Sequence, residues 1–424
     1  MGVMFSSRKF GLAWHGATMA ATVSMLCLAG CGDDTAGGSP GASTGGGGAS
    51  GTSSTTGTSS TTTGGTGGSS GGSAADVARK LGRKANFLIG MGNDLNNNHD
   101  MDGAYTVGAT LDLHDAYLVG GSFPWTKWNT DAQGDGAFAA ILCDSAKSHG
   151  VAPMFTLYSM ASRTENDPKV LVDDTFMKPY WDQAKILFQR LGSFDAPSVV
   201  HLEPDWWGFA QQAAGGDPTM LPAHVGTLAP DCAGQPETLV GMGQCLVVLG
   251  RKYAPKAILG FHASRWANPD PAKIASYLVQ IGAGDSDIVV TDTLDRDAGC
   301  FEAHTDPSCQ RNDGPWYWDE TNTKSPTFHE HLAWAKAIVQ GTGKPMLWWQ
   351  TPFGVPSATP GGMAGHYRDN RVKYIFDHPD EFVAAGGLGA EFGTGSGNQT
   401  YIDTDGGQFK TAVGKYFAAP VPLP

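Results

Sequence analysis

The 424-residue sequence has few basic residues and, after its first thirty positions, no long hydrophobic run. Lysine and arginine number 28 against 41 aspartates and glutamates, which gives a formal net charge of −13. Nucleic acids and anionic membrane surfaces are bound by clusters of basic side chains, so this balance argues against both partners. No later stretch is apolar over the length that crosses a bilayer. A phosphate-binding loop and a dinucleotide fingerprint are also missing, and we expect no cofactor.

Cysteine is scarce too, and no two cysteines have the two-residue spacing of a zinc site. Cys232 is close to Cys245 in the chain, and Cys300 is close to Cys309. In an exported protein such pairs are typical of short-loop disulfides, which we expect here in preference to a metal site. Cys143 is then left over, and we expect it to be free and buried on a helix.

The N-terminal region resembles a bacterial lipoprotein signal. Two basic residues precede an apolar stretch at residues 17–28, and residues 28–31 read Leu-Ala-Gly-Cys, the form of a lipobox. The resemblance implies that residues 1–30 are a signal peptide and that a lipid on Cys31 anchors the protein in the bacterial outer membrane, at the cell surface or the periplasmic face. An ordinary secretory signal is the alternative. Residues 31–75 are mostly Gly, Ser and Thr, which predicts a flexible tether.

Residues 76–424 alternate short apolar runs with segments of helical period, the pattern of parallel βα units. We predict a monomeric α/β domain with the (βα)8 TIM-barrel fold or a distorted variant of it. A doubly wound open sheet is the alternative, but its nucleotide fingerprint is absent. The predicted strands cover residues 86–92, 116–120, 151–158, 198–203, 257–262, 287–292, 345–350 and 387–393.

The stretch richest in side chains suited to catalysis is 199–207, Val-Val-His-Leu-Glu-Pro-Asp-Trp-Trp. Alternation of side chains along a strand places His201, Glu203 and Asp205 on one face. Pro204 cannot donate to a central strand, so the strand should end at Glu203 and pass Asp205 and both tryptophans to a loop. Carboxylates beside flat aromatic rings suit the cleavage of a glycosidic bond. A surface turn above two packed indoles is the alternative.

Tryptophans gather at the predicted strand ends, where nine of the twelve occur. In a barrel the active site lies at the C-terminal ends of the strands, whereas structural tryptophans would be spread over helices and strand middles. We therefore predict a sugar-binding cleft formed by Trp125, Trp128, Trp206, Trp207, Trp266 and Trp348, with the polar residues Arg163, His201, His262, Arg265 and Gln350.

The candidate catalytic residues are Asp205, Glu203, Glu391, Tyr158 and Asp292. Nearby Asp295 and Asp297 are expected to face solvent. Residues 94–103 alternate oxygen ligands as calcium loops do but lack the closing glutamate, so a solvated polar loop is favoured and no metal site is predicted.

Two groups of glycoside hydrolases resemble these motifs. In retaining barrel glycosidases the fourth strand ends in Asn-Glu-Pro and the seventh in a nucleophilic Glu. Here Leu202 replaces the Asn and Gln350 replaces the nucleophile. Glu203-Pro204-Asp205 also resembles the Glu-Pro-Asp of family-6 glycoside hydrolases, which are inverting cellobiohydrolases and endoglucanases.

Tyr158 and Arg163 keep that family's Tyr-to-Arg spacing, but its later carboxylate-bearing stretch is replaced by 351–355. The family-6 resemblance implies that Asp205 is the general acid, with Tyr158 and Arg163 positioning the sugar. The base on water would be Glu391 or, as second choice, Asp292.

We therefore predict a surface-anchored glycoside hydrolase that cleaves a β-linked polysaccharide. A non-catalytic polysaccharide-binding barrel is the main alternative. A structural lipoprotein is a third possibility, and it requires buried tryptophans.

Overall fold

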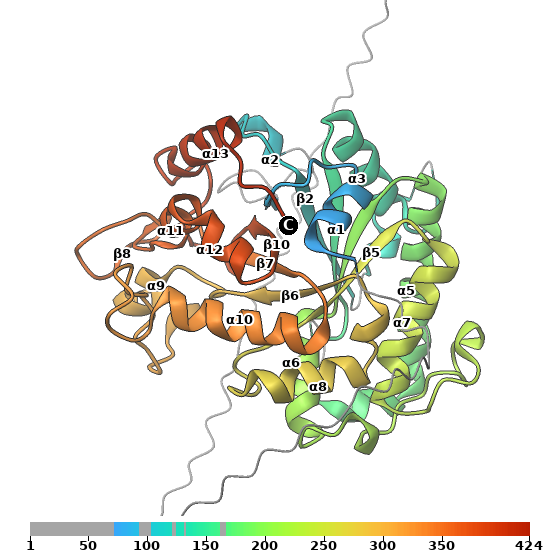
Figure 1. Ribbon diagram of the computed structural model, residues 1–424. Helices are drawn as coiled ribbons and strands as arrows, with labels where there is room; N and C mark the ends of the chain where they lie inside the picture. Colours follow the sequence, from blue (N-terminus) through green and yellow to red (C-terminus); the bar gives the residue numbers. More distant parts are fainter. Residues whose placement is uncertain (1–71, 93–102, 121–123, 131–132, 162–166) are drawn as a thin grey trace, which may run out of the picture. The chain divides into compact units, whose positions relative to one another are not determined.

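The computed structural model describes residues 72–92, 103–120, 124–130, 133–161 and 167–424. Within these ranges eight parallel strands form a closed barrel in the order β1-β10-β7-β6-β5-β4-β3-β2, with β1 also paired to β2 (Figure 1). The predicted (βα)8 barrel is confirmed. The proposed signal, nearly all of the tether and the calcium-like loop lie outside the described residues.

All eight predicted strands are present, each overlapping its expected range. Their bounds are β1 Leu88–Met91, β2 Leu113–Val119, β3 Ala152–Tyr158, β4 Ser198–Leu202, β5 Ala257–His262, β6 Ile288–Asp292, β7 Met346–Thr351 and β10 Gly387–Phe392. Two short strands, β8 Gly362–Met363 and β9 His366–Tyr367, form a separate antiparallel pair.

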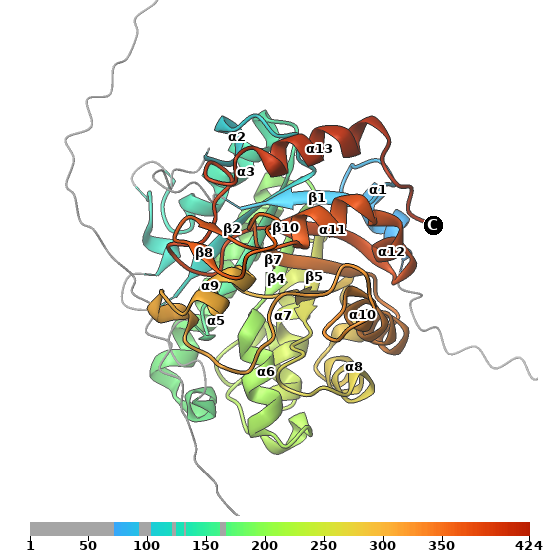
Figure 2. The same cartoon turned by 90° about the vertical axis from the view of Figure 1, so that its left-hand side faces the viewer.

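Helices surround the barrel, and α8 and α10 run side by side outside it (Figures 1 and 2). The α-helices are α1 Ala74–Lys80, α2 Gly103–Thr106, α3 Ala137–Ser148, α5 Asp174–Phe194, α6 Pro204–Ala213, α7 Leu239–Tyr253, α8 Pro271–Gln280, α9 Ala298–Ala303, α10 Phe328–Thr342, α11 Arg371–Asp377, α12 Pro379–Ala384 and α13 Gln408–Ala418. Short 3-10 helices are η1 Trp125–Lys127, η2 Pro168–Val172, η3 Pro218–Met220, η4 Pro230–Cys232, η5 Ala283–Asp285 and η6 Pro307–Cys309. None of the helices in the described ranges is both long and apolar enough to cross a membrane.

The long helix α5 shows how the sequence sets these elements. Its N-cap Asp173 accepts a hydrogen bond from the backbone of Thr175, which satisfies one of the free amides at the helix start. Its buried side chains recur every three or four residues, from Phe176 to Leu191, and form one apolar face. This face packs the helix against the barrel and its neighbours, as its sequence period predicts.

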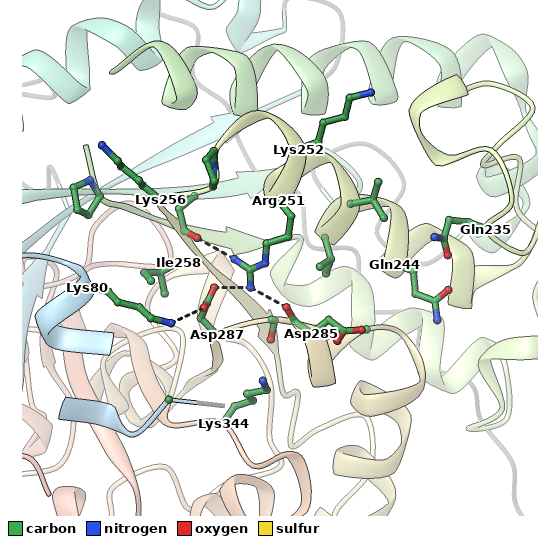
Figure 3. A pocket seen from close by; sticks show the side chains of 18 residues that line it. Lys80, Gln235, Gln244, Arg251, Lys252, Lys256, Ile258, Asp285, Asp287 and Lys344 are labelled. Atoms are coloured by element: carbon green, nitrogen blue, oxygen red, sulfur yellow. Dashed lines mark hydrogen bonds and ion pairs between the residues drawn. The ribbon is translucent and has the colours of Figure 1, made fainter. Parts of the chain in front are cut away.

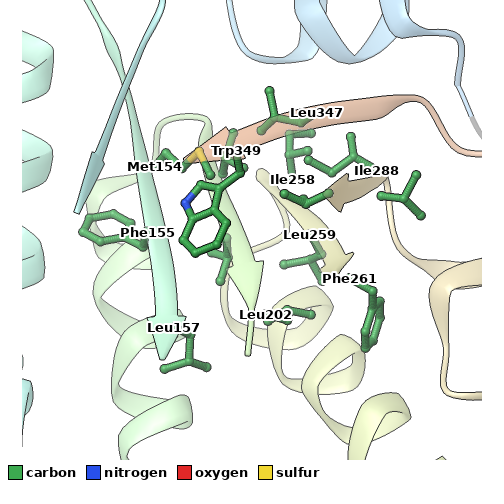
Figure 4. Close-up of a cluster of buried hydrophobic side chains, with 14 of the residues drawn as sticks. Met154, Phe155, Leu157, Leu202, Ile258, Leu259, Phe261, Ile288, Leu347 and Trp349 are labelled. Atoms are coloured by element: carbon green, nitrogen blue, oxygen red, sulfur yellow. The ribbon is translucent and has the colours of Figure 1, made fainter. Parts of the chain in front are cut away.

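Alternation along β7 sends two adjacent indoles to opposite sides of the barrel wall. Trp349 points inward, because its ring lies 4.8 Å from that of His201 on β4 and 5.8 Å from that of His262 on β5. Figure 4 shows Trp349 among apolar residues of β3, β4, β5 and β6. Trp348 points outward, where its ring lies 4.8 Å from that of Phe382 on α12.

The cysteines pair as the spacing predicts. Cys232 is bonded to Cys245, which links η4 to α7, and Cys300 is bonded to Cys309, which links α9 to η6. Each disulfide closes a short loop and so limits the conformations of the unfolded chain. Cys143 is free and buried in α3.

Candidate functional site

The end of β4 differs from the sequence expectation. The strand ends at Leu202, and α6 begins directly at Pro204, so Asp205, Trp206 and Trp207 lie in a helix and the predicted loop is wrong. Proline favours the first turn of a helix because its missing N–H has no partner there in any case. Glu203 between them has a left-handed φ of 43°. This left-handed residue breaks the alternation of side chains, so His201, Glu203 and Asp205 do not share one face of a strand as predicted.

Glu203 turns into the protein and is fully buried, with 0% of its surface exposed. Its Oε2 accepts a hydrogen bond of 2.8 Å from the backbone N–H of Met160, which joins the ends of β3 and β4. Burial raises the pKa of Glu203 to about 8, even though hydrogen bonds from Met160 and Tyr180 oppose the shift. A carboxyl group with no exposed surface has no access to substrate, so we do not place Glu203 among the reacting groups.

The buried proton of Glu203 predicts a pH-dependent stability. Its pKa is 4.5 in an exposed glutamate and about 8 here. The contribution of this group to stability is therefore complete below pH 4.5 and is lost as the pH rises toward 8, by up to about 1.4 kcal/mol per pH unit. Glu203→Gln keeps a neutral side chain of the same shape, so its free energy of unfolding should fall less steeply over this range.

Urea unfolding at intervals from pH 4.5 to 8 measures this slope. Asp182→Asn, which removes an exposed carboxylate on α5, should keep the wild-type slope. Parallel curves for wild type and Glu203→Gln would show that Glu203 is already ionised in the folded protein.

Asp205 occupies the first turn of α6 and is half-buried. Its Oδ2 accepts a hydrogen bond of 2.8 Å from the hydroxyl of Tyr158, the last residue of β3. Burial raises the pKa of Asp205, and the negative charges of Asp292 and Asp295 add to the increase. The charge of His262 and the Tyr158 hydrogen bond only partly oppose it. Asp205 therefore tends to hold its proton, as a general acid must.

Asp292 ends β6 and has the opposite tendency. Its Oδ1 lies 3.3 Å from Nε2 of His262, the last residue of β5, and 25% of the Asp292 side chain is exposed. Burial alone would raise the pKa of Asp292, but the hydrogen bond and charge of His262 outweigh it, and the pKa lies below its ordinary value. The other nitrogen of His262, Nδ1, lies 3.1 Å from Nε2 of the fully buried His201. The two predicted histidines thus form a chain from His201 through His262 to Asp292.

Glu391, our first choice as base from the sequence, lies in a different environment. Only 2% of its surface is exposed, and its Oε2 accepts a 2.8 Å hydrogen bond from the backbone N–H of Gln350. Gln350 has a left-handed φ of 53°, and its amide donates to the hydroxyl of Tyr117 on β2. Glu391 is thus held by β7, whereas Asp292 is partly open. The structure therefore favours Asp292 over Glu391 as the second carboxylate.

Sequence reasoning missed a buried polar group inside the barrel. Oδ2 of Asp115 accepts hydrogen bonds of 2.9 Å from Thr156 and 3.1 Å from the indole of Trp349, and burial raises its pKa to about 6. Asp115 was missed because the predicted second strand begins one residue after it. Trp349 was missed although strand parity would have found it, since Trp348 and Trp349 necessarily face opposite sides.

Four of the six predicted sugar-binding tryptophans do not fit that role. Trp125, Trp206, Trp207 and Trp348 are each at most 1% exposed, so their rings have no free face for a sugar. The reason is packing: the indole N–H of Trp207 donates to the carbonyl of Leu202, and Trp348 lies under α12.

Of the other predicted binding residues, His201, His262 and Gln350 are buried by packing inside the barrel, whereas three remain at least partly exposed. Trp266 is 42% exposed and packs on Phe209 of α6, with the ring centroids 4.5 Å apart. Its neighbour Arg265 is exposed, and Trp128 is half-buried. Arg163 lies outside the described residues.

Asp297 also departs from its expected place. It is fully buried, not solvent-facing, because its carboxylate accepts hydrogen bonds from the backbone of Gly354 at 2.9 Å and of Thr400 at 2.7 Å. Burial and the nearby charge of Asp369 raise its pKa to about 7. Asp295 is half-exposed and pairs with Arg296 and Arg311.

The fold and the site together define a parallel β/α barrel with an acidic pair, Asp205 and Asp292, at the C-terminal ends of its strands. No protein-family model and no curated protein sequence matches this chain.

Solved structures with some similarity include three sugar-active enzymes. The endoglucanase Cel6 from Mycobacterium tuberculosis is 17% identical, with a TM-score of 0.34 over 56% of this chain and 62% of that chain, which is less than two thirds of its length. A β-mannanase from a symbiotic protist of the termite Reticulitermes speratus is 11% identical, with a TM-score of 0.43 over 80% and 88%. A D-allulose 3-epimerase from Methylomonas sp. is 9% identical, with a TM-score of 0.39 over 79% and 98%. These similarities are too low to indicate an activity, so the function has to be argued from the residues.

Proposed function

We propose that this protein is a glycoside hydrolase that cleaves a β-linked polysaccharide with Asp205 as general acid and Asp292 as its ionised partner. The observation that carries the proposal is the position of two partly exposed carboxyl groups at the C-terminal ends of the strands, Asp205 held by the hydroxyl of Tyr158 and Asp292 held by His262. Their surroundings raise the pKa of Asp205 and lower that of Asp292. Two titratable groups whose environments separate their pKa values in this way are suited to paired acid and base roles.

In the proposed reaction, Asp205 donates its proton to the glycosidic oxygen as the bond to the leaving sugar breaks. Asp292 acts as the base that accepts a proton from the attacking water. His262, supported by His201, is a positioning residue that keeps Asp292 ionised and oriented. Trp266, which is exposed and packs on α6, the helix that carries Asp205, is available to cover the apolar face of a sugar ring.

The hydrogen bond from Tyr158 predicts the direction of a pH shift. It stabilises the Asp205 carboxylate and so lowers the pKa of that acid. Tyr158→Phe should therefore move the alkaline limb of the kcat/KM profile to higher pH, by about one unit for a hydrogen bond to a charged group. Tyr253→Phe, which removes a hydroxyl bonded to Asp231 on another part of the surface, should leave the limb in place. A shift to lower pH would contradict the assignment of Asp205 as the acid.

The experiment that tests the function itself is a screen of the chain on soluble and insoluble glucans, xylans and mannans. Release of reducing ends supports the hydrolase. Adsorption without release would replace it with a non-catalytic polysaccharide-binding protein.

We further propose that the folded domain is tethered to the outer membrane through a lipid on Cys31. The lipobox-like residues 28–31 and the Gly/Ser/Thr-rich stretch after them support this location. Cys31→Ser should release the protein from the membrane fraction of a bacterial expression host.

A further inference from the structure

A large pocket opens at the other end of the barrel, where the strands begin. It has a volume of about 1450 Å³ and is lined by the first residues of β5 and by residues just before β4, β6 and β7 (Figure 3). The proposed catalytic pair lies at the opposite, C-terminal ends of the strands. A ligand in this pocket would therefore bind independently of the proposed reaction.

Cationic side chains gather at the pocket in a chain that is acidic as a whole. Five cationic side chains line it, against two acidic ones, Asp285 and Asp287. Two of the cations pair with Asp231 and Asp195, which are not among the lining residues, so the local surplus is one positive charge. The whole chain has a formal net charge of −13. A concave site of one sign attracts ligands of the other, so this contrast favours a negatively charged ligand. The five cations are Lys80, Arg251, Lys252, Lys256 and Lys344.

Four of the five cations already have acidic partners. Arg251 pairs with Asp287 at 2.8 Å, and Lys80 lies 3.7 Å from the same carboxylate. Lys252 pairs with Asp231 at 2.5 Å, and Lys256 pairs with Asp195 at 2.8 Å.

Lys344 is the exception. It is 96% buried, with 4% of its surface exposed, and it lines the pocket just before β7 (Figure 3). Within the described part of the chain, its amino group has no hydrogen bond or ion pair. Burial lowers the pKa of Lys344, although the charges of Asp287 and Asp285 oppose this. The amino group is not one of the fully buried polar atoms that lack a partner, so it reaches the solvent of the pocket, where a bound oxyanion would supply a partner.

Apolar side chains form another part of the lining of this pocket. Val247 and Ile258 are buried, and Pro197 and Val248 are partly buried around the same pocket. Ligand sites commonly combine such an apolar wall with a few polar groups that fix orientation. We propose that the pocket binds a small molecule with an oxyanion group, a carboxylate or a phosphate, which pairs with Lys344 while the body of the molecule packs on the apolar wall.

Calorimetric titration of the full chain tests this site, with inorganic phosphate and with glucuronate as separate probes and with ionic strength held constant by chloride. We expect saturable binding of at least one probe, and the probe that binds identifies the oxyanion. Lys344→Met should weaken binding at least tenfold, while Lys344→Arg, which keeps the charge, should retain most of it. Lys273→Met, which removes an exposed lysine of α8 outside the pocket, is the matched control.

Two results would overturn the proposal: no saturable binding of either probe to the wild-type chain, or equal affinity of wild type and Lys344→Met. The first needs no variant, so it decides the question even if a substitution prevents folding. Hydrolysis by the opposite end of the barrel is expected to be unchanged in Lys344→Met. A failure of this proposal is thus distinguishable from a failure of the proposed hydrolase activity.

Discussion

Asp205→Asn is expected to lower kcat on the preferred polysaccharide by about 10²–10⁴-fold, the range for loss of a general acid. Asparagine has nearly the same shape and can still accept the hydrogen bond from Tyr158, so the site should keep its structure. It has no proton to donate to the leaving oxygen. Initial rates of reducing-end release, measured with the circular dichroism spectrum as a check on folding, give the comparison.

The leaving group provides a second test of the role of Asp205. In an aryl glycoside with an acidic phenol, the phenolate leaves without being protonated. Asp205→Asn should therefore lose much less activity on this substrate than on the polysaccharide. Asp217→Asn is the matched control, because it removes an exposed aspartate at the start of η3, where asparagine caps equally well. A variant that keeps more than a tenth of wild-type kcat on polysaccharide would exclude Asp205 as the acid.

Arg371→Met is expected to cause the largest loss of stability, about 3–5 kcal/mol in the free energy of unfolding. Arg371 and Asp369 are both fully buried and are 2.8 Å apart at their closest atoms. The same carboxylate accepts a 2.7 Å hydrogen bond from the backbone N–H of Ala298, and the guanidinium lies 4.5 Å above the ring of Trp318. Methionine fills much of the space but leaves the Asp369 charge buried near Asp297 without its cation.

Urea unfolding with an unchanged m-value measures this loss. Lys178→Ala is the control, since its ion pair with Asp182 on α5 is 3.3 Å long but exposed on both sides, and such pairs contribute at most about 1 kcal/mol. A loss of less than about 1 kcal/mol in Arg371→Met would mean that the buried pair adds little to stability.

The order of strands and helices was readable from the sequence because each element carries its own period. All eight strands, the apolar face of α5 and both disulfides follow from local spacing, and the structure agrees with each. Asp205 and Tyr158 were likewise predictable as neighbours, because adjacent parallel strands end on the same side of a barrel.

What the sequence alone left undecided depends on dihedral angles and on packing between distant segments. Sequence position placed Glu203 beside Asp205, but one left-handed residue turned Glu203 into the interior. Strand ends suggested a belt of indoles, yet packing under helices buried four of the six predicted ones. The choice of Asp292 over Glu391 rests on His262 from another strand and on a backbone N–H of β7. The local spacing of apolar residues therefore determined the barrel. Burial and long-range contacts, which cannot be read from a linear sequence, decided which carboxyl groups are exposed and in which direction their pKa values move.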